Sequence, residues 1–231
     1  MNSYRYLLFD ADETLFDFQK AEHEAFHLTC DAGGIEFSEE IYQVYSEIND
    51  ALWKLLEKGG TTLPELKLER YRQLLEHLRY PEEGMIQKAA EMRDLYVDFL
   101  RQQAFLIPDA VEVCRTLSER YTLYIITNGI SRIQRARLAK TPIKEYIADI
   151  FISEEIGTAK PAAAYFDYVF EKIGDADKSK YLVIGDSLSS DIKGAVNYGL
   201  DSCWVNRKGM TTDLPVTYTV NTLHEIFDIF N

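Results

Sequence analysis

The chain has 231 residues, of which 46% are hydrophobic, and it carries a formal net charge of −13. This length fits one large domain or one domain with a sizeable insertion, and 12 glycines and six prolines are too few for a fibrous or low-complexity disordered protein. So acidic a surface repels DNA, RNA and anionic membranes, which leaves small charged ligands as the expected partners.

The cysteines favour a reducing compartment. Cys30, Cys114 and Cys203 are far apart and odd in number, so the sequence predicts no disulfide framework. The segment MNSYRYLLFDADET has only a short apolar run before acidic residues, and no later segment is apolar enough to cross a membrane. We therefore expect a cytoplasmic, globular protein.

The first predicted strand, Tyr6–Phe9, is an apolar run without polar alternation, which is typical of a parallel strand buried on both faces. The sequence then predicts four helices without a strand: Phe18–Ala32, Glu39–Glu57, Leu63–Leu78 and Gly84–Gln103. Such a block after the first strand indicates an inserted domain. We expect an α/β catalytic core of residues 1–16 and 105–231 and an all-helical cap of residues 17–104.

Strands and helices alternate in the rest of the chain. The predicted strands are Tyr121–Thr127, Ile150–Ile152, Tyr181–Ile184 and Cys203–Val205. The predicted helices are Asp109–Arg120, Ser131–Lys140, Ala162–Ile173 and Ser189–Tyr198. This alternation predicts a doubly wound, Rossmann-like core with a parallel sheet and right-handed crossovers.

Acidic residues follow two of the predicted strands. Asp10 and Asp12 follow the first, and residues i and i+2 of an extended chain point the same way, toward the sheet edge where ligands bind in open α/β folds. Asp186 follows the fourth strand, and Asp191 lies in the first turn of the next helix, where compensation of the helix dipole alone could explain it. Carboxylates gathered at one edge would repel one another unless a divalent cation lay among them, and Mg²⁺ is the usual ion of phosphate sites.

Groups suited to a phosphate lie at the same edge. Thr127 and Asn128 end the second strand just before the predicted helix at Ser131, and the N–H groups at a helix N-terminus can cradle an anion. Lys160 precedes the next helix and supplies positive charge. Each feature alone is equally typical of a solvated turn, a capped helix or an exposed lysine.

Taken together and in this order, these pieces resemble the haloacid dehalogenase (HAD) superfamily over nearly the whole chain, and the helical insert resembles its cap. Four segments, DADETLFDF, ITNGISRIQ, GDSLSSDIKG and Ile48–Trp53, resemble the pyrimidine 5′-nucleotidases of the YjjG/YfnB type within it. Many members of the superfamily carry glycine where this chain has Glu13, so we expect a different turn after Asp12.

The resemblance implies a Mg²⁺-dependent phosphomonoester hydrolase that acts through an aspartyl-phosphate, most closely a 5′-nucleotidase preferring pyrimidine nucleoside monophosphates. Asp10 would be the nucleophile and Asp12 the general acid and base. Lys160 would neutralise the charge of the nucleophile and the phosphate. The implied partner is a small phosphate ester, with no polymeric nucleic acid and no membrane.

The resemblance also implies the ligands of the metal and of the phosphate. Mg²⁺ would be held by the Asp10 carboxylate, the Asp12 backbone carbonyl and Asp186, with Asp191 binding directly or through water. Thr127 and Asn128 would hold phosphate oxygens.

Several alternatives stay open at this point. A sugar-phosphate phosphatase or a phosphomutase would use the same core, and a non-catalytic ligand-binding relative would keep the fold without the reaction. Family analogy and aromatic content suggest Phe16, Phe18 and Trp53 as a surface for a nucleobase, although packing in the core also explains each of them.

A competing motif lies in the first predicted cap helix. His23-Glu24-Ala25-Phe26-His27 fits the H-E-x-x-H pattern of zinc proteases, with Glu47 as a possible third ligand. At 100° per residue, both histidines point away from the apolar face of this helix and toward solvent. We therefore expect no zinc site there.

Overall fold

The computed structural model describes residues 4–230, and within them six strands form one sheet in the order β3-β2-β1-β4-β5-β6. All neighbouring strands are parallel. The strands are β1 (Tyr6–Asp10), β2 (Thr122–Thr127), β3 (Ile147–Ile152), β4 (Tyr181–Gly185), β5 (Asp201–Val205) and β6 (Tyr218–Val220). The predicted doubly wound α/β fold is confirmed, and the direction of winding reverses at β1, which has β2 on one side and β4 on the other.

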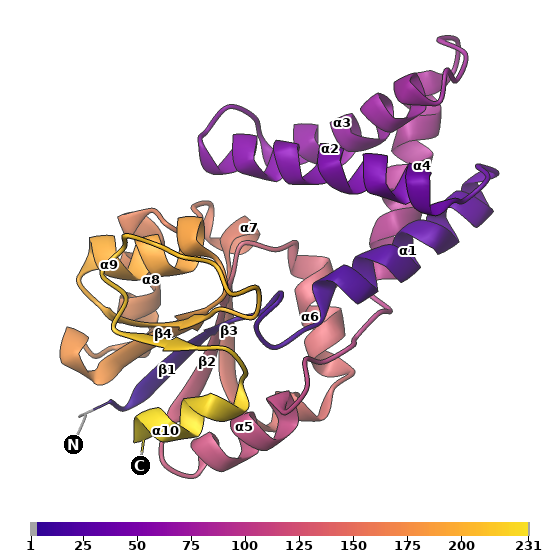
Figure 1. Cartoon of the computed structure of the whole chain (residues 1–231). Helices are drawn as coiled ribbons and strands as arrows, with labels where there is room; N and C mark the ends of the chain where they lie inside the picture. The colour runs from indigo at the N-terminus through magenta and orange to yellow at the C-terminus, as the bar shows by residue number, and fades with distance from the viewer. Residues whose placement is uncertain (1–3, 231) are drawn as a thin grey trace. The chain divides into compact units, whose positions relative to one another are not determined.

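Helices cover both faces of the sheet, as Figure 1 shows for α8 and α9 on one side and α5 and α10 on the other. Their bounds are α5 (Ala110–Ser118), α6 (Ser131–Ala139), α7 (Ser153–Ile156), α8 (Ala163–Ile173), α9 (Lys193–Tyr198) and α10 (Phe227–Phe230). Leu7 and Phe9 of β1 face the cluster that contains α5, whereas Tyr6 and Leu8 face the cluster that contains α8. Because all of β1 is buried, its apolar run has no polar alternation.

The short helical turns are η1 (Pro142–Tyr146), η2 (Lys178–Lys180), η3 (Leu188–Ile192) and η4 (His224–Ile226). The single helix expected at Ser189–Tyr198 is in fact the π-helical turn η3 followed by α9. The strand β6 is not predicted from the sequence, because it is a three-residue edge strand in which only Val220 is buried and its apolar signal is weak.

The inserted segment forms α1 (Phe18–Gly33), α2 (Glu39–Glu57), α3 (Leu63–His77) and α4 (Met85–Leu100). Ser38 caps α2 by accepting a hydrogen bond from the backbone of Ile41, and Thr62 with Glu65 forms a capping box that starts α3. The four predicted cap helices are all present, with ends that differ by at most a few residues.

The chain divides into two compact units: one runs up to Phe18 and resumes at Ala104, and the other spans Gln19–Gln103. The core bounds expected from the sequence, 1–16 and 105–231, include residues 1–3 and 231, which lie outside the described part of the chain.

The points where the chain leaves the core unit and returns to it are paired. Phe16 forms an antiparallel bridge with Leu106. The Asp17 backbone N–H donates to the Phe105 carbonyl at 3.1 Å, and the Ile107 N–H donates to the Leu15 carbonyl at 3.0 Å. The insertion therefore begins and ends at one place in the core unit.

The interior of the cap holds a polar cluster. The Asn49 amide donates to Glu22 at 2.9 Å, and Arg70 donates to the Asn49 side-chain oxygen at 3.1 Å. All three residues are buried, and the Arg70 guanidinium carbon lies 4.4 Å from the centroid of the Tyr96 ring. Burial raises the pKa of Glu22 to about 7, although Arg70 opposes the shift.

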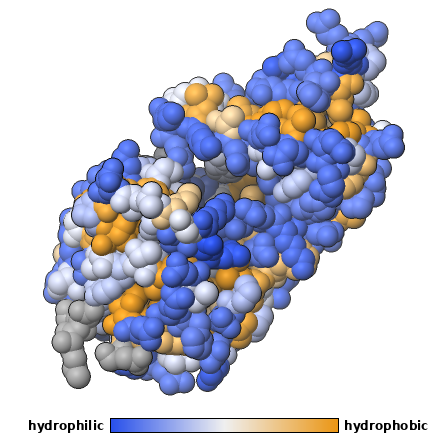
Figure 2. Space-filling model, viewed as in Figure 1, coloured by the Kyte–Doolittle hydropathy of each residue, from blue (hydrophilic) through white to orange (hydrophobic). Residues whose placement is uncertain are grey.

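Within residues 4–230 each helix is too short or too polar to span a lipid bilayer. On the face drawn in Figure 2, hydrophilic residues predominate on the surface, as the composition leads one to expect.

Candidate active site

Three carboxylates meet at the C-terminal edge of the sheet. Asp10 is the last residue of β1 and pairs with Ile126 of β2, while Asp186 directly follows β4. Carboxylate oxygens of Asp10, Asp186 and Asp191 lie within 4.8 Å of one another. These residues are the acidic set predicted from the sequence, apart from Asp12.

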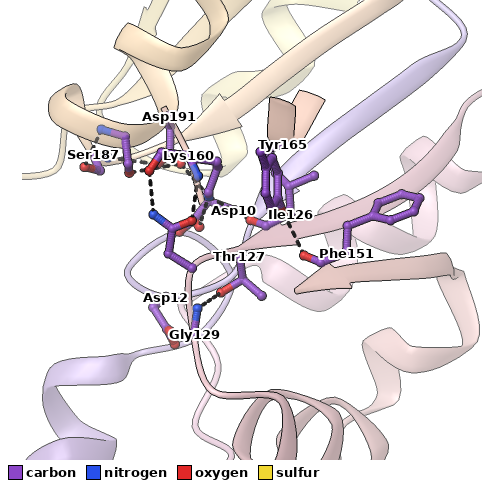
Figure 3. A network of polar contacts seen from close by, with 12 residues as sticks. Asp10, Asp12, Ile126, Thr127, Gly129, Phe151, Lys160, Tyr165, Ser187 and Asp191 are labelled. Atoms are coloured by element: carbon purple, nitrogen blue, oxygen red, sulfur yellow. Dashed lines mark hydrogen bonds and ion pairs between the residues drawn. The ribbon is translucent and has the colours of Figure 1, made fainter. Parts of the chain in front are cut away.

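Lys160 lies among these carboxylates (Figure 3). Its Nζ donates to Asp10 Oδ1 and to Asp191 Oδ1, each at 2.6 Å, and to the Ile126 carbonyl at 2.8 Å. The lysine is 1% exposed. Burial by itself would lower its pKa, but Asp10 and Asp191 raise the pKa above its ordinary value, so the side chain is a fixed cation.

One lysine does not compensate three acids. Burial, and after it the charge of Asp191, raises the pKa of Asp10 well above its ordinary range even though Lys160 opposes the shift. Burial and Asp191 also raise the pKa of Asp186 to about 7. The set is therefore short of positive charge, and it offers only oxygen donors, which are the ligands that Mg²⁺ prefers. The residues present fit a magnesium ion.

The position of Asp191 depends on the π-helical turn and on Gly185. The Ser187 backbone N–H donates to Asp191 Oδ2 at 3.1 Å, and the Asp191 N–H donates to the Ser187 carbonyl at 3.0 Å. A Cβ atom on Gly185 would lie 2.3 Å from Asp191 Oδ2, so only glycine leaves space for this carboxylate. Turns of this kind are frequent at functional sites.

The predicted phosphate ligands lie at the ends of β2 and α6. Thr127 Oγ1 accepts a hydrogen bond from the Gly129 N–H at 3.0 Å, which leaves its hydroxyl proton available to donate. The Asn128 side chain both donates to and accepts from the Lys160 backbone, each at 2.9 Å, and therefore positions the lysine. The Ser131 N–H at the start of α6 donates to Glu154 at 2.8 Å.

Asp12 does not face the same place as Asp10, contrary to the expectation from their spacing. The strand ends at Asp10, and in Figure 3 the Asp12 side chain points away from Asp10, Lys160 and Asp191. Its Oδ1 accepts from Arg137 Nη1 and its Oδ2 accepts from Gln134 Nε2, each at 2.6 Å. Neither partner is predicted from the sequence, where their only signal is two polar residues three apart on the buried face of α6.

The turn after Asp12 contains a non-glycine residue in the left-handed region. Glu13 has φ 60°, its N–H donates to the Phe16 carbonyl at 2.8 Å, and its carboxylate lies 3.4 Å from Arg207 Nη1. Glycine adopts this conformation without strain, whereas a residue with a side chain, such as Glu13, adopts it at a cost in energy.

Phe16 offers no surface for a nucleobase, so this expectation is corrected. It is fully buried in the core, and the Arg137 guanidinium carbon lies 4.6 Å from its ring centroid. Phe18 is half-buried at 5.8 Å from the same guanidinium, and Trp53 is a half-buried residue of the cap helix α2.

The residues of the H-E-x-x-H pattern form ordinary contacts of the cap. His23 Nε2 lies 3.0 Å from Glu39, and His27 Nε2 lies 3.6 Å from Asp31. Glu47 accepts a hydrogen bond from Gln43 at 3.0 Å. In the described part of the chain, no cluster of three potential metal ligands includes either histidine.

Comparison with known proteins places this geometry in a family. The family model of haloacid dehalogenase-like hydrolases matches residues 4–199. The HAD-hydrolase YfnB of Bacillus subtilis is 37% identical over 233 residues, covering 100% of this chain and 97% of YfnB. A crystal structure of YfnB bound to magnesium matches with a TM-score of 0.92 at 36% identity, covering 99% of each chain.

Two further relatives carry an activity in their names. The pyrimidine 5′-nucleotidase PynA of Streptococcus pneumoniae is 35% identical, covering 97% of this chain and 94% of PynA. The pyrimidine 5′-nucleotidase YjjG of Escherichia coli is 33% identical, covering 96% of this chain and 95% of YjjG. The α/β fold, the acidic edge around Lys160 and these matches agree, and the chain belongs to the haloacid dehalogenase-like hydrolases.

Proposed function

We propose that this hydrolase cleaves phosphomonoesters with Asp10 as its nucleophile, and that its substrates are nucleoside 5′-monophosphates, pyrimidine ones preferred. The observation that carries the proposal is the buried Lys160, held at 2.6 Å from Asp10 and Asp191 with Asp186 beside them. A carboxylate attacks an anionic phosphate only when cations offset the repulsion, and this arrangement supplies one fixed cation and a site for another.

The reaction is divided between two aspartates. An Asp10 oxygen forms a bond to phosphorus as the bond to the ester oxygen, on the opposite side of phosphorus, breaks. Asp12, whose side chain points away from Asp10, gives a proton to the alkoxide that leaves on that side. Asp12 then takes a proton from the water that attacks phosphorus and releases phosphate from Asp10. One acid/base residue therefore serves both displacements.

The other residues hold the phosphate and its charge. Lys160 keeps its position because Asn128 holds its backbone and three oxygens surround its Nζ. Thr127 donates a hydrogen bond from its hydroxyl to a phosphate oxygen. Asp10, Asp186 and the Asp12 carbonyl would hold Mg²⁺, with Asp191 binding it directly or through water, and the ion would supply positive charge opposite the phosphate.

The preference for pyrimidine nucleotides rests on the relatives. PynA and YjjG are named pyrimidine 5′-nucleotidases, and each aligns over nearly its full length with both the core and the cap of this chain. We also propose a cytoplasmic location, which is supported by three free and buried cysteines, as suits a reducing compartment.

The test is phosphate release from UMP, dTMP, purine nucleotides, sugar phosphates and p-nitrophenyl phosphate with Mg²⁺. We expect turnover of UMP and dTMP that EDTA abolishes and that Asp10→Asn lowers by a factor of roughly 10³ or more. Asp213→Asn, at an exposed position, is the matched control. If only sugar phosphates are hydrolysed, the proposed substrate class is wrong and the proposed mechanism stands. If no ester releases phosphate in a metal-dependent way, the whole proposal is refuted.

A further inference from the structure

We infer that Gln134 and Arg137 are positioning residues for Asp12, which hold both oxygens of its carboxylate and fix the direction from which it exchanges protons. The inference rests on the proposed role of Asp12 as acid and base. Both side chains donate to Asp12, whereas the Lys160 ammonium donates to Asp10, Asp191 and the Ile126 carbonyl, so Gln134 and Arg137 act on the reaction through Asp12.

The contacts hold the carboxylate on two sides. Arg137 Nη1 donates to Oδ1 and Gln134 Nε2 donates to Oδ2, each at 2.6 Å. Both donors lie on one face of α6, because residues three apart in a helix are neighbours. A carboxylate held at both oxygens cannot rotate without breaking a hydrogen bond, so its orientation follows α6.

The two donors are themselves fixed by packing. The Arg137 side chain is fully buried and lies against the rings of Phe16 and Phe18. Gln134 is buried as well, and its amide passes so close to Gly129 that a Cβ there would lie 2.3 Å from Nε2. The glycine after Thr127 and Asn128 therefore provides the space through which Gln134 reaches Asp12.

One polar atom of Gln134 lowers the stability of the fold. Because a carboxylate only accepts hydrogen bonds, the amide NH₂ must face Asp12, and the opposite atom, Oε1, is buried with no partner in residues 4–230. A buried acceptor without a partner destabilises a fold. Methionine has a similar length and no such acceptor, so Gln134→Met keeps the packing, and we expect its melting temperature to equal or exceed that of the wild type.

Two substrates with different leaving groups distinguish a positioning role from a general loss of activity. The alkoxide released from UMP needs a proton from Asp12, whereas p-nitrophenolate leaves without one, so a misplaced acid slows formation of the aspartyl-phosphate from UMP only. Hydrolysis of the aspartyl-phosphate is common to both substrates, so the readout is the rate of leaving-group release in the first turnover, with enzyme in excess. We expect Gln134→Met to lower this rate by about 10- to 100-fold for UMP and by less than about threefold for p-nitrophenyl phosphate.

The panel contains three further single variants. Arg135→Met is the matched control, since Arg135 lies on the same helix and pairs with Glu155 at 2.6 Å instead of with Asp12. Arg137→Lys keeps the buried charge but not the planar donor, and we expect the same selective loss. Asp12→Asn removes the proton donor itself and should show the largest difference between the two substrates.

Selective loss in Gln134→Met and Arg137→Lys, with Arg135→Met like the wild type, supports the inference. The double variant Asp12→Asn/Gln134→Met should then be no slower on UMP than Asp12→Asn alone. If Gln134→Met and Arg137→Lys slow both substrates equally, or slow neither, while Asp12→Asn slows UMP selectively, the positioning role is overturned and the proposed mechanism stands. If Asp12→Asn itself is not selective, the failure lies in the proposed role of Asp12, and the inference falls with it.

Discussion

Replacing Lys160 with methionine removes the cation that two buried carboxylates share. Each Nζ–Oδ1 distance is 2.6 Å, so Coulomb's law gives about 6 kcal/mol per pair at an effective dielectric constant of about 20. Much of this attraction offsets the desolvation of the three groups. Breaking a buried pair by removing one partner typically destabilises a protein by about 3–5 kcal/mol, which is the loss in free energy of unfolding that we expect.

The loss should depend on pH and on magnesium. Because Lys160 lowers the pKa of Asp10 and of Asp186, its removal raises both values further in the folded state, and that of Asp186 rises from about 7. A carboxyl with a raised pKa in the folded state stabilises the fold at low pH and loses this contribution as the pH rises. The loss in free energy of unfolding relative to the wild type should therefore be larger at pH 8 than at pH 6. Magnesium binding to the folded state should restore part of the loss.

The assay is equilibrium unfolding in urea at both pH values, with EDTA or with Mg²⁺. Lys144→Met, at an exposed lysine of the same unit, controls for the loss of charge alone and should change the free energy of unfolding by less than about 0.5 kcal/mol. A Lys160→Met protein that loses less than about 1 kcal/mol at pH 8 in EDTA would refute the reasoning, since it would show that the carboxylates do not need the lysine.

Three other substitutions test single features of the structure. Gly185→Ala places a Cβ 2.3 Å from Asp191 and should raise the Mg²⁺ concentration for half-maximal activity by about tenfold or more, whereas Gly33→Ala, with ordinary contacts, should not. Glu22→Gln should weaken the dependence of the free energy of unfolding on pH, because the wild type loses about 3 kcal/mol from this carboxyl as the pH rises from 4.5 to about 7. If urea unfolding gives the two proteins the same change in free energy over this pH range, the raised pKa of Glu22 is contradicted. Glu13→Gly relieves the left-handed conformation and should add about 1 kcal/mol to the free energy of unfolding, and a lower melting temperature would argue against strain there.

Local patterns predict the fold and the acidic edge. The strand at Tyr6–Phe9 is apolar at every position because both faces of the sheet are covered, so its burial is visible in the sequence. Asp10 and Asp186 follow such runs directly, and in a parallel sheet this alone places them at one edge.

The partners of these residues are not predicted by local patterns. Gln134 and Arg137 reach Asp12 across more than 120 positions of the chain, and nothing near either residue indicates a carboxylate opposite. The role of Phe16 is predicted wrongly for a different reason. An aromatic residue beside an active-site loop suits substrate binding and core packing equally, and Phe16 belongs to the core. Spacing also fails for Asp12, because the rule of alternate side chains holds only while the chain remains extended.

The paired crossing at Phe16 and Leu106 has a consequence for the folding of the chain. In the sheet β1 pairs with β2, and the whole cap lies between them in sequence. Closing a flexible loop of roughly 90 residues costs on the order of 4 kcal/mol in chain entropy. Helical segments make mostly local contacts and form quickly, so cap structure that forms early shortens the disordered part of this loop. The hydrogen bonds beside Phe16 and Leu106 then close it at the point from which β1 and β2 can align.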